Sequence, residues 1–265
     1  ANVEKQIAQI NDMIDKHVDG IVVMAASDTA ENPVLEAAMK AGIPVVTSDH
    51  YVTSTKLTCQ IYVDQLQWGR VTAQWLVDQL GPGGGNIVVL NGVAGNADNN
   101  GRWGGAKEVF DKHPEIKILA MANADWDQAK AQQAVANLLP SFPKIDGIWS
   151  QGGAMTLGAV YAFQAANRPL VPMAGEANNG LLKVWKKELA NGFDSVAPAC
   201  PSTMGAMALD NAVKVLGGQK MAKATLLTPP VITAETLDQY VRPDLSDALW
   251  LPTILSPEQL QALFH

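Results

Sequence analysis

The chain has 265 residues, of which 48% are hydrophobic and 17% are charged, so it can fill the cores of more than one average domain. Its formal net charge is −7, and no basic run is present to neutralise phosphates, which argues against a nucleic-acid partner and an anionic membrane. Gly, Pro or charged residues interrupt the apolar stretches well before the roughly 18 residues that a spanning helix requires. The composition therefore predicts a soluble protein with two lobes.

The elements alternate along the chain. Helical spacing of Ile7, Ile10 and Ile14 predicts an amphipathic helix over residues 3–17, and a strand follows at 20–24. Further strands or extended segments are expected at 43–49, 57–64, 87–91, 116–121, 146–151, 169–176, 194–197 and 228–232. Further helices are expected around 71–80, 102–113, 126–139, up to 190, 201–216 and 257–264. This alternation predicts an α/β fold with parallel sheets.

One unit occurs twice, over residues 19–49 and 146–176. In each copy a strand-length apolar run leads through a small-residue loop and an alanine-rich helix to a second apolar run that ends in a carboxylate, Asp49 or Glu176. Two such units predict two similar parallel-sheet lobes. Ligands of open α/β sheets bind outside the carboxyl ends of the strands, so the two acids are expected to face one cleft.

Two further segments follow strands. Residues 91–102 open a helix and concentrate amides around Arg102. Amides and a guanidinium suit hydroxyl groups, so a ligand-binding segment is favoured over a plain solvated loop. Trp126 comes just after a strand, where its ring could stack on the apolar face of a sugar or belong to the core. His50, beside Asp49, is expected either to pair with that acid against a polar ligand or to be an exposed loop residue.

No catalytic or metal-binding pattern is found. The histidines are scattered without carboxylates at ligand spacing, and the chain has no nucleophile elbow, zincin motif or dinucleotide-binding glycine motif. Gly81 begins a glycine-rich turn between a helix and a strand, the reverse of the order in a phosphate-binding loop. We therefore expect no enzyme activity, no metal and no cofactor. Cys59 and Cys200 could form one bridge or remain two buried thiols.

Several short motifs occur in a recognisable order. They are Asp19-Gly-Ile-Val-Val, Ala41-Gly-Ile-Pro-Val-Val, Val63-Asp64 with Gly69-Arg70, the run from Gly83 to Leu90, Arg102 with Gly105, Trp126-Asp127 and Leu157-Gly158. Together they resemble the sugar-binding proteins of bacterial ABC importers, of the ribose- and galactose-binding type. The resemblance covers essentially the whole chain.

The resemblance implies the type I periplasmic binding protein fold, in which two Rossmann-like parallel-sheet lobes are joined by a three-strand hinge and close on a monosaccharide or polyol. The expected lobes are residues 1–63 plus 200–231 and residues 64–199 plus 232–265. The three crossings are expected near residues 63–64, 199–200 and 231–232. The expected partners are the sugar or polyol and an ABC permease in the inner membrane, and the expected location of the monomeric protein is periplasmic or extracytoplasmic.

The family's binding residues carry over in part. The strand-end acid of the first lobe matches Asp49, the cleft arginine matches Arg102 and the stacking aromatic residue matches Trp126. In the second lobe Gln151 is the nearest polar group after the strand, and either Glu176 or Asn178 must replace the family's acid. With His50, these residues form the expected ligand site.

Two departures from the family pattern bear on the ligand and on the length of the protein. A hinge glutamine that is common in ribose binders is Ala199 here, so the ligand is expected not to be ribose. Family members begin with a strand, a helix and a strand before the helix at which this chain starts, and a sheet without those strands has an unpaired edge. The expectation is a truncated version of a longer protein, which also lacks a family cluster of Asn and aromatic residues that contacts the sugar. The N-terminus lacks a signal-peptide pattern, so the chain was either processed or never exported.

Two other functions are compatible with the same fold. The first is the effector-binding core of a LacI-type transcriptional repressor, which a helix-turn-helix upstream would support and a signal peptide would exclude. The second is an α/β enzyme that acts on a small metabolite, which turnover of a sugar would support.

Overall fold

The computed structural model describes residues 2–228, 230–253 and 255–264, and they form two compact units. The first unit comprises Ala1–Asp64, Gly95–Asp98 and Ser202–Thr228, and the second comprises Gln65–Ala94, Asn99–Pro201 and Pro229–His265. The lobe boundaries expected from the sequence place residues 95–98 in the second lobe, whereas their contacts group them with the first unit. The mixed α/β architecture with parallel sheets agrees with the predicted fold class.

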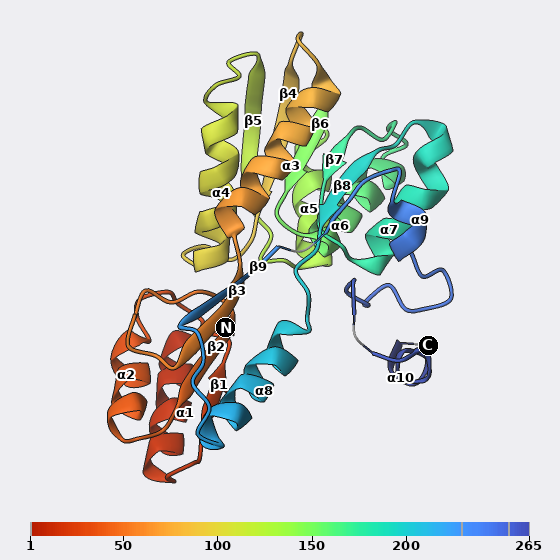
Figure 1. The fold of residues 1–265 in the computed structure, drawn as a ribbon. Coiled ribbons are helices and arrows are strands. Elements are labelled where there is room, and N and C mark those ends of the chain that lie inside the picture. The colour runs from red at the N-terminus through yellow and green to blue at the C-terminus, as the bar shows by residue number, and fades with distance from the viewer. Residues whose placement is uncertain (1, 229, 254, 265) are drawn as a thin grey trace. The chain divides into compact units, whose positions relative to one another are not determined.

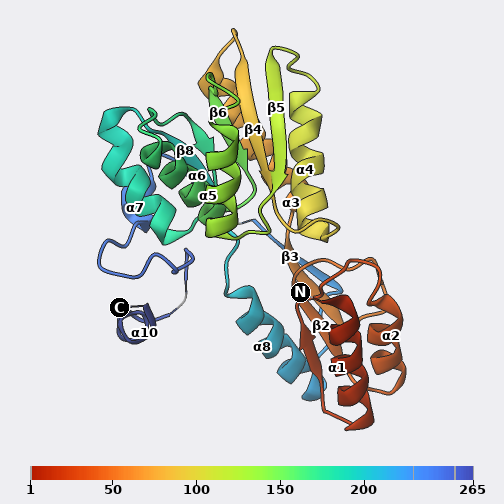
Figure 2. The ribbon, with the colours of Figure 1, turned by 180° about the vertical axis from the view of Figure 1, so that it is seen from behind.

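The first unit is built around a four-stranded sheet in which all neighbouring strands are parallel, in the order β1-β2-β3-β9. Its strands are β1 (Ile21–Val23), β2 (Val45–Asp49), β3 (Cys59–Val63) and β9 (Ala224–Leu227). Helices α1 (Val3–Asp15) and α2 (Asn32–Lys40) cover one face, and α8 (Met204–Leu216) covers the other (Figures 1 and 2). Strand β9 was not predicted, and it completes the sheet by pairing with β3.

Strand β1 stands at one edge of this sheet. Among the described residues it pairs only with β2, and the side chains of Val22 and Met24 are 38% and 54% exposed. On α8, Leu209, Val213 and Leu216 are also more than half exposed. An edge strand beside exposed apolar side chains is the kind of surface that additional strands would cover. That the chain is part of a longer protein nevertheless stays a prediction.

Glu31 is a buried acid in the first unit, at the start of α2. It is 0% exposed, its Oε2 accepts a hydrogen bond from the backbone N–H of Ala26 at 3.0 Å, and its Oε1 has no partner among the described residues. Desolvation by burial raises the pKa of the Glu31 carboxyl above its ordinary value of 4.5, although the backbone N–H groups of Ser27 and Ala26 oppose the shift. In the folded protein this carboxyl therefore keeps its proton to a higher pH than in the unfolded chain.

This raised pKa predicts a pH-dependent stability. The contribution of Glu31 is fully present below pH 4.5 and is lost as the pH rises through the folded-state pKa. We expect the free energy of unfolding of the wild type to fall relative to that of Glu31→Gln as the pH rises above 4.5, as measured by urea unfolding at a series of pH values. Glu36 is the control of opposite sign, because a hydrogen bond from Lys56 lowers its pKa. A difference between wild type and Glu31→Gln that is independent of pH would contradict the assignment.

The second unit contains a six-stranded sheet in the order β10-β8-β7-β6-β4-β5, parallel except for β10. Its strands are β4 (Gly85–Asn91), β5 (Ile116–Asn123), β6 (Gly147–Ser150), β7 (Met173–Ala174), β8 (Ser195–Pro198) and β10 (Val231–Ile232). Its helical elements are α3 (Gln65–Leu80), α4 (Ala97–Phe110, whose first two residues belong to the first unit), α5 (Gln128–Leu138), α6 (Gly153–Ala165), α7 (Asn179–Glu188), η1 (Leu189–Asn191), α9 (Leu237–Tyr240) and α10 (Pro257–Phe264).

Both faces of this sheet are buried along β4, whereas the edge strand β5 is largely exposed. Along β4, Ile87 and Val89 join a core with α3 and α4, whereas Val88 and Leu90 join a second core with α5, α6 and α7. A parallel sheet that is covered on both faces needs continuous apolar strands rather than alternating ones. The uninterrupted apolar run from Ile87 to Leu90 fits this requirement.

Three elements differ from the prediction. Helix α4 begins at Ala97 rather than at Arg102, so part of the amide-rich segment is helical. Strand β7 contains only Met173 and Ala174, because the prolines at 169 and 172 have no N–H to donate to a sheet. The short helix α9 was not predicted.

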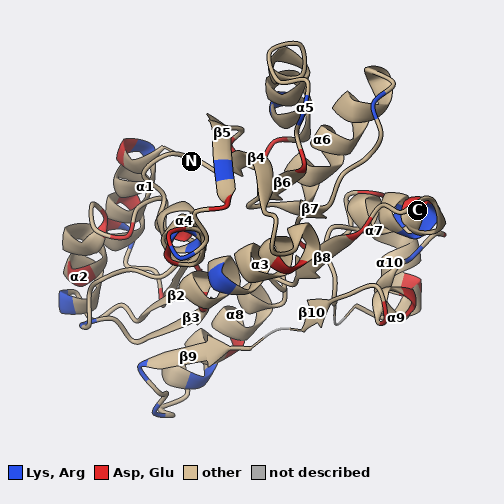
Figure 3. Ribbon diagram, turned by 90° about the horizontal axis from the view of Figure 1, so that it is seen from above, with Lys and Arg blue, Asp and Glu red and all other residues tan. Residues whose placement is uncertain are grey.

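Lys and Arg are dispersed among Asp and Glu along the elements drawn in Figure 3 rather than gathered in a stripe. No helix in the described part of the chain is long and apolar enough to cross a bilayer. Cys59 and Cys200 are not joined by a disulfide, and burial raises the pKa of the Cys59 thiol.

Candidate functional site

Polar and aromatic side chains gather at one edge of the sheet of the second unit. Strands β4, β5, β6 and β7 run parallel to their sheet neighbours, so their carboxyl ends lie at the same edge. Asn91 ends β4, Trp126 follows β5, Gln151 follows β6 and Glu176 follows β7. The last three are residues predicted for the site, and the parallel topology brings them to one edge.

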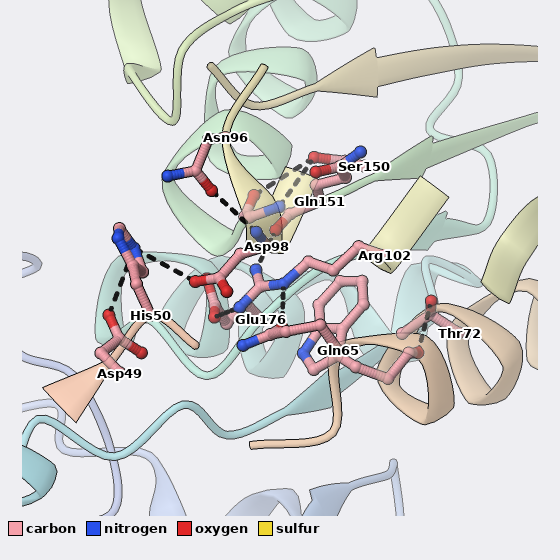
Figure 4. A network of polar contacts seen from close by, with 12 residues as sticks. Asp49, His50, Gln65, Thr72, Asn96, Asp98, Arg102, Ser150, Gln151 and Glu176 are labelled. Carbon is pink, nitrogen blue, oxygen red and sulfur yellow. Dashed lines mark hydrogen bonds and ion pairs between the residues drawn. The ribbon is translucent and has the colours of Figure 1, made fainter. Parts of the chain in front are cut away.

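Arg102, on α4, lies among these strand ends and is only 3% exposed. Its Nη2 donates to Glu176 Oε1 at 2.9 Å, its Nη1 donates to the backbone carbonyl of Gln151, and its Nε donates to Gln65 Oε1 at 2.7 Å (Figure 4). The Arg102–Glu176 ion pair is buried on both sides. Breaking such a pair by removing one partner is costly, because the other charge is left without compensation in a poorly solvated place.

Two residues of α3 hold the same guanidinium, and neither was predicted as a site residue. Gln65 accepts the Nε hydrogen bond, and the ring of Trp68 lies under the guanidinium with its centroid 4.4 Å from Arg102 Cζ. The distance suits a cation–π contact. The sequence contains a weak signal for them, because Gly69 follows Trp68 directly and allows α3 to approach α4 closely.

Gln151 is fully buried and organises the neighbouring amides. Its Nε2 donates to Asn91 Oδ1 at 2.9 Å and to the backbone carbonyl of Asn99 at 3.3 Å. Its Oε1 has no hydrogen-bond partner among the described residues. Asn91 and Asn99 belong to the amide-rich segment that was predicted to bind hydroxyl groups, so the structure places that segment beside Arg102.

Trp126 lies over the ends of two strands. A Cβ atom on Gly92 would be 2.3 Å from Trp126 Cε2, and one on Gly152 would be 2.8 Å from its Cδ1, so both positions require glycine while the ring stays there. Asp125 and Trp126 have φ angles of 55° and 57°, in the left-handed region that a bulky residue rarely adopts. The ring is partly buried against the core, and its backbone is strained at the edge where the polar groups gather.

Asn178 has a structural role in this unit. Its Oδ1 accepts from the backbone N–H of Leu181 at 3.3 Å and caps α7, while its Nδ2 donates to the backbone carbonyl of Asp247 at 3.0 Å. Both ends of the amide therefore have backbone partners. Of the two residues predicted to replace the family's acid, Glu176 is the one that faces Arg102, and it has the chemistry of an acceptor for hydroxyl groups.

The first unit carries a separate cluster at the ends of its strands. His50 Nε2 lies 3.1 Å from Asp98 Oδ2 and 3.7 Å from Asp49 Oδ2, and His50 Nδ1 lies 2.6 Å from the backbone carbonyl of Ala25. His50 is thus not an exposed loop residue and lies near both acids, but its pairing with Asp49 against a polar ligand stays a prediction. Asp98 was not predicted as a site residue, although it belongs to the amide-rich segment.

This cluster is the one group in the described part of the chain that could share a cation. One ligand atom from each of Asp49, His50 and Asp98 lies within 4.8 Å of the other two. No metal-ligand spacing was recognised in the sequence, because Asp98 is distant from Asp49 and His50 along the chain. The same three side chains could also accept and donate hydrogen bonds to hydroxyl groups.

Comparison with known proteins identifies the family of the chain. The periplasmic binding protein domain family matches residues 1–220. A xylitol-binding protein of Mycolicibacterium smegmatis is 33% identical over 66% of this chain and 50% of its own length, so the chain spans half of that relative. A ribose import binding protein of Bacillus subtilis is 26% identical over 83% of the chain and 70% of its length.

A solved structure supports the fold over a larger part of the chain. The crystal structure of a protein from Mycobacterium smegmatis in complex with β-D-fucofuranose has a TM-score of 0.80 and 28% identity, covering 90% of this chain and 80% of that one. The family and these relatives are binding proteins rather than enzymes. The match over residues 1–220, together with the strand-end site, shows that the chain belongs to the periplasmic binding protein domain family.

Proposed function

We propose that the chain binds a neutral monosaccharide or polyol as the solute-binding component of a bacterial ABC importer. The observation that carries the proposal is the buried group of Arg102, Gln151 and Glu176 beside the ring of Trp126. Hydroxyl groups both donate and accept hydrogen bonds, so they suit a site that offers a guanidinium, an amide and a carboxylate. An aromatic ring suits the apolar C–H face of a sugar.

The charges favour an uncharged ligand. Arg102 is balanced within its own unit by Glu176 at 2.9 Å, so the second unit offers no surplus positive charge to a sugar phosphate or a sugar acid. In the first unit, Asp49 and Asp98 supply two carboxylates around the single imidazole of His50. Binding an anion at either group would bring it close to a carboxylate, which costs free energy in a poorly solvated place.

The remaining parts of the proposal come from family membership. We propose Asp49 and His50 as ligand contacts of the first unit, two lobes joined by a three-strand hinge that closes on the ligand, and delivery to a permease in the inner membrane. The protein is proposed to act outside the cytoplasm as a monomer. A LacI-type repressor or an enzyme is the less favoured function, because the relatives reported above are named as binding proteins.

A thermal-shift screen against pentoses, hexoses and polyols tests the proposal, with xylitol and ribose included because relatives are named for them. A ligand at 100 times its dissociation constant stabilises the protein that binds it by about 2.7 kcal/mol. We expect at least one neutral compound to raise the unfolding temperature by several degrees and sugar phosphates to have no effect. No shift with any neutral sugar or polyol would contradict the proposed function, and turnover of the bound sugar would favour an enzyme.

A further inference from the structure

Gln65 is a polar residue buried beside the candidate site, and one of its polar groups has no partner among the described residues. It is 9% exposed, and its Oε1 accepts the Nε hydrogen bond of Arg102 at 2.7 Å. Because Arg102 Nε can only donate, this bond fixes the orientation of the amide and directs Nε2 away from Arg102 Nε. Nε2 is buried and has no hydrogen-bond partner among the described residues. An amide donor without a partner costs stability, which a residue retained only for packing would avoid.

The surrounding residues hold Gln65 in place. A Cβ atom on Gly101 would lie 2.9 Å from Gln65 Cβ, so glycine at that position leaves room for the side chain. On the same helix as Gln65, the ring of Trp68 supports the face of the Arg102 guanidinium. Helix α3 therefore determines both the plane of the guanidinium, through Trp68, and its rotation within that plane, through Gln65.

We propose that Gln65 is a positioning residue that aims the Nη groups of Arg102 at the strand ends where the sugar binds. With Nε held by Gln65, Nη1 and Nη2 point to the backbone of Gln151 and to Glu176 (Figure 4). Without that bond the planar guanidinium can move with the torsions of its side-chain stem, and its donors no longer have one fixed direction. This role of Gln65 rests on the proposed sugar-binding function, and so does the measurement of affinity described below.

Gln65→Met is the central variant, because it keeps the length of the side chain and removes both the acceptor and the unpartnered donor. We expect the affinity for the best compound of the screen, with xylitol as the first probe, to fall about tenfold or more in titration calorimetry, as for a hydrogen bond to a charged group. The unfolding temperature should change little, because removing the unpartnered Gln65 donor offsets the loss of the acceptor for Arg102 Nε. Gln79→Met, at an exposed position of the same helix, is the matched control and should change neither quantity. A lower unfolding temperature with unchanged affinity would overturn the proposal.

A second measurement is independent of any sugar. The chain has four arginines, so the Nε–H signals in a ¹⁵N NMR spectrum can be assigned by substitution, and that of Arg102 is expected to exchange slowly with water. Gln65→Met should make this exchange fast, and Gln65→Glu, which keeps an acceptor there, should keep it slow. Unchanged exchange in Gln65→Met would overturn the positioning role. Failure of every sugar to bind, with the NMR result as expected, would instead reject the proposed function and leave the positioning of Arg102 supported.

Discussion

Arg102→Met should destabilise the second unit by about 3–5 kcal/mol and abolish sugar binding. The variant leaves the Glu176 carboxylate, with a side chain 6% exposed, without its buried cation. Glu176→Met should cost a similar amount because it removes the carboxylate that forms the ion pair with the buried guanidinium. The double variant removes both charges, so most of the lost stability should return, while binding should remain absent. Urea unfolding and titration calorimetry on the three variants measure the two effects separately.

An exposed pair at the end of the same helix provides the control. Lys107 on α4 and Asp111, the residue after α4, lie 2.7 Å apart with side chains more than half exposed, and such pairs contribute between about 0 and 1 kcal/mol. Lys107→Met should therefore have little effect on stability and none on binding. If Arg102→Met costs no more than Lys107→Met, the buried pair does not have the energetic role assigned to it.

The sequence was sufficient for the features that depend on local pattern and on chain topology. The paired units around Asp49 and Glu176 predicted parallel strands, and parallel strands place whatever follows them at one edge of a sheet. This is why Trp126, Gln151 and Glu176 could be assigned to one edge before the structure was known. In the structure these three residues follow β5, β6 and β7, as that reasoning predicts.

Other features depend on contacts that no local pattern reveals. Strand β9 alternates between exposed and half-buried residues at the edge of its sheet, and pairing with β3 determines its conformation. The start of α4 was missed because Asn and Asp disfavour helix interiors, although the same side chains favour helix starts. Here Asn96 Oδ1 accepts from the backbone N–H of Asp98 at 2.8 Å, and the helix begins around it.

Asn178 and Gln65 show the same limit within the site. Both are amides near strand ends or helix starts, and the sequence cannot tell which amide has a backbone partner and which faces a charged group. Asn178 caps α7, whereas Gln65 receives the Nε hydrogen bond of Arg102. The difference arises from the approach of α4 to α3, two helices whose contacting residues are far apart in the chain.

That approach depends on glycine at positions where the two helix backbones touch. A Cβ atom on Gly105 of α4 would lie 1.9 Å from the backbone oxygen of Leu66 on α3, and one on Gly69 would lie 2.0 Å from the backbone oxygen of Arg102. Backbone atoms cannot move aside as the end of a flexible side chain can, so α3 and α4 would have to separate. Since α3 carries Gln65 and α4 carries Arg102, the separation would also disturb the site.

Gly105→Ala should therefore destabilise the second unit by about 3 kcal/mol or more, at or above the upper end of the usual cost of overpacking, and should weaken sugar binding. Gly104→Ala is the control one residue away, because its Cβ atom would meet only Leu66 Cδ1 at an ordinary 3.4 Å. Alanine is a better helix former than glycine by roughly 0.5–1 kcal/mol, so this variant should be as stable as the wild type or more stable. Urea unfolding of the two variants, with calorimetric titration of the sugar, measures the contrast. Equal stabilities of Gly104→Ala and Gly105→Ala would mean that α3 and α4 are not in backbone contact. The position of the Arg102 side chain would then require another explanation.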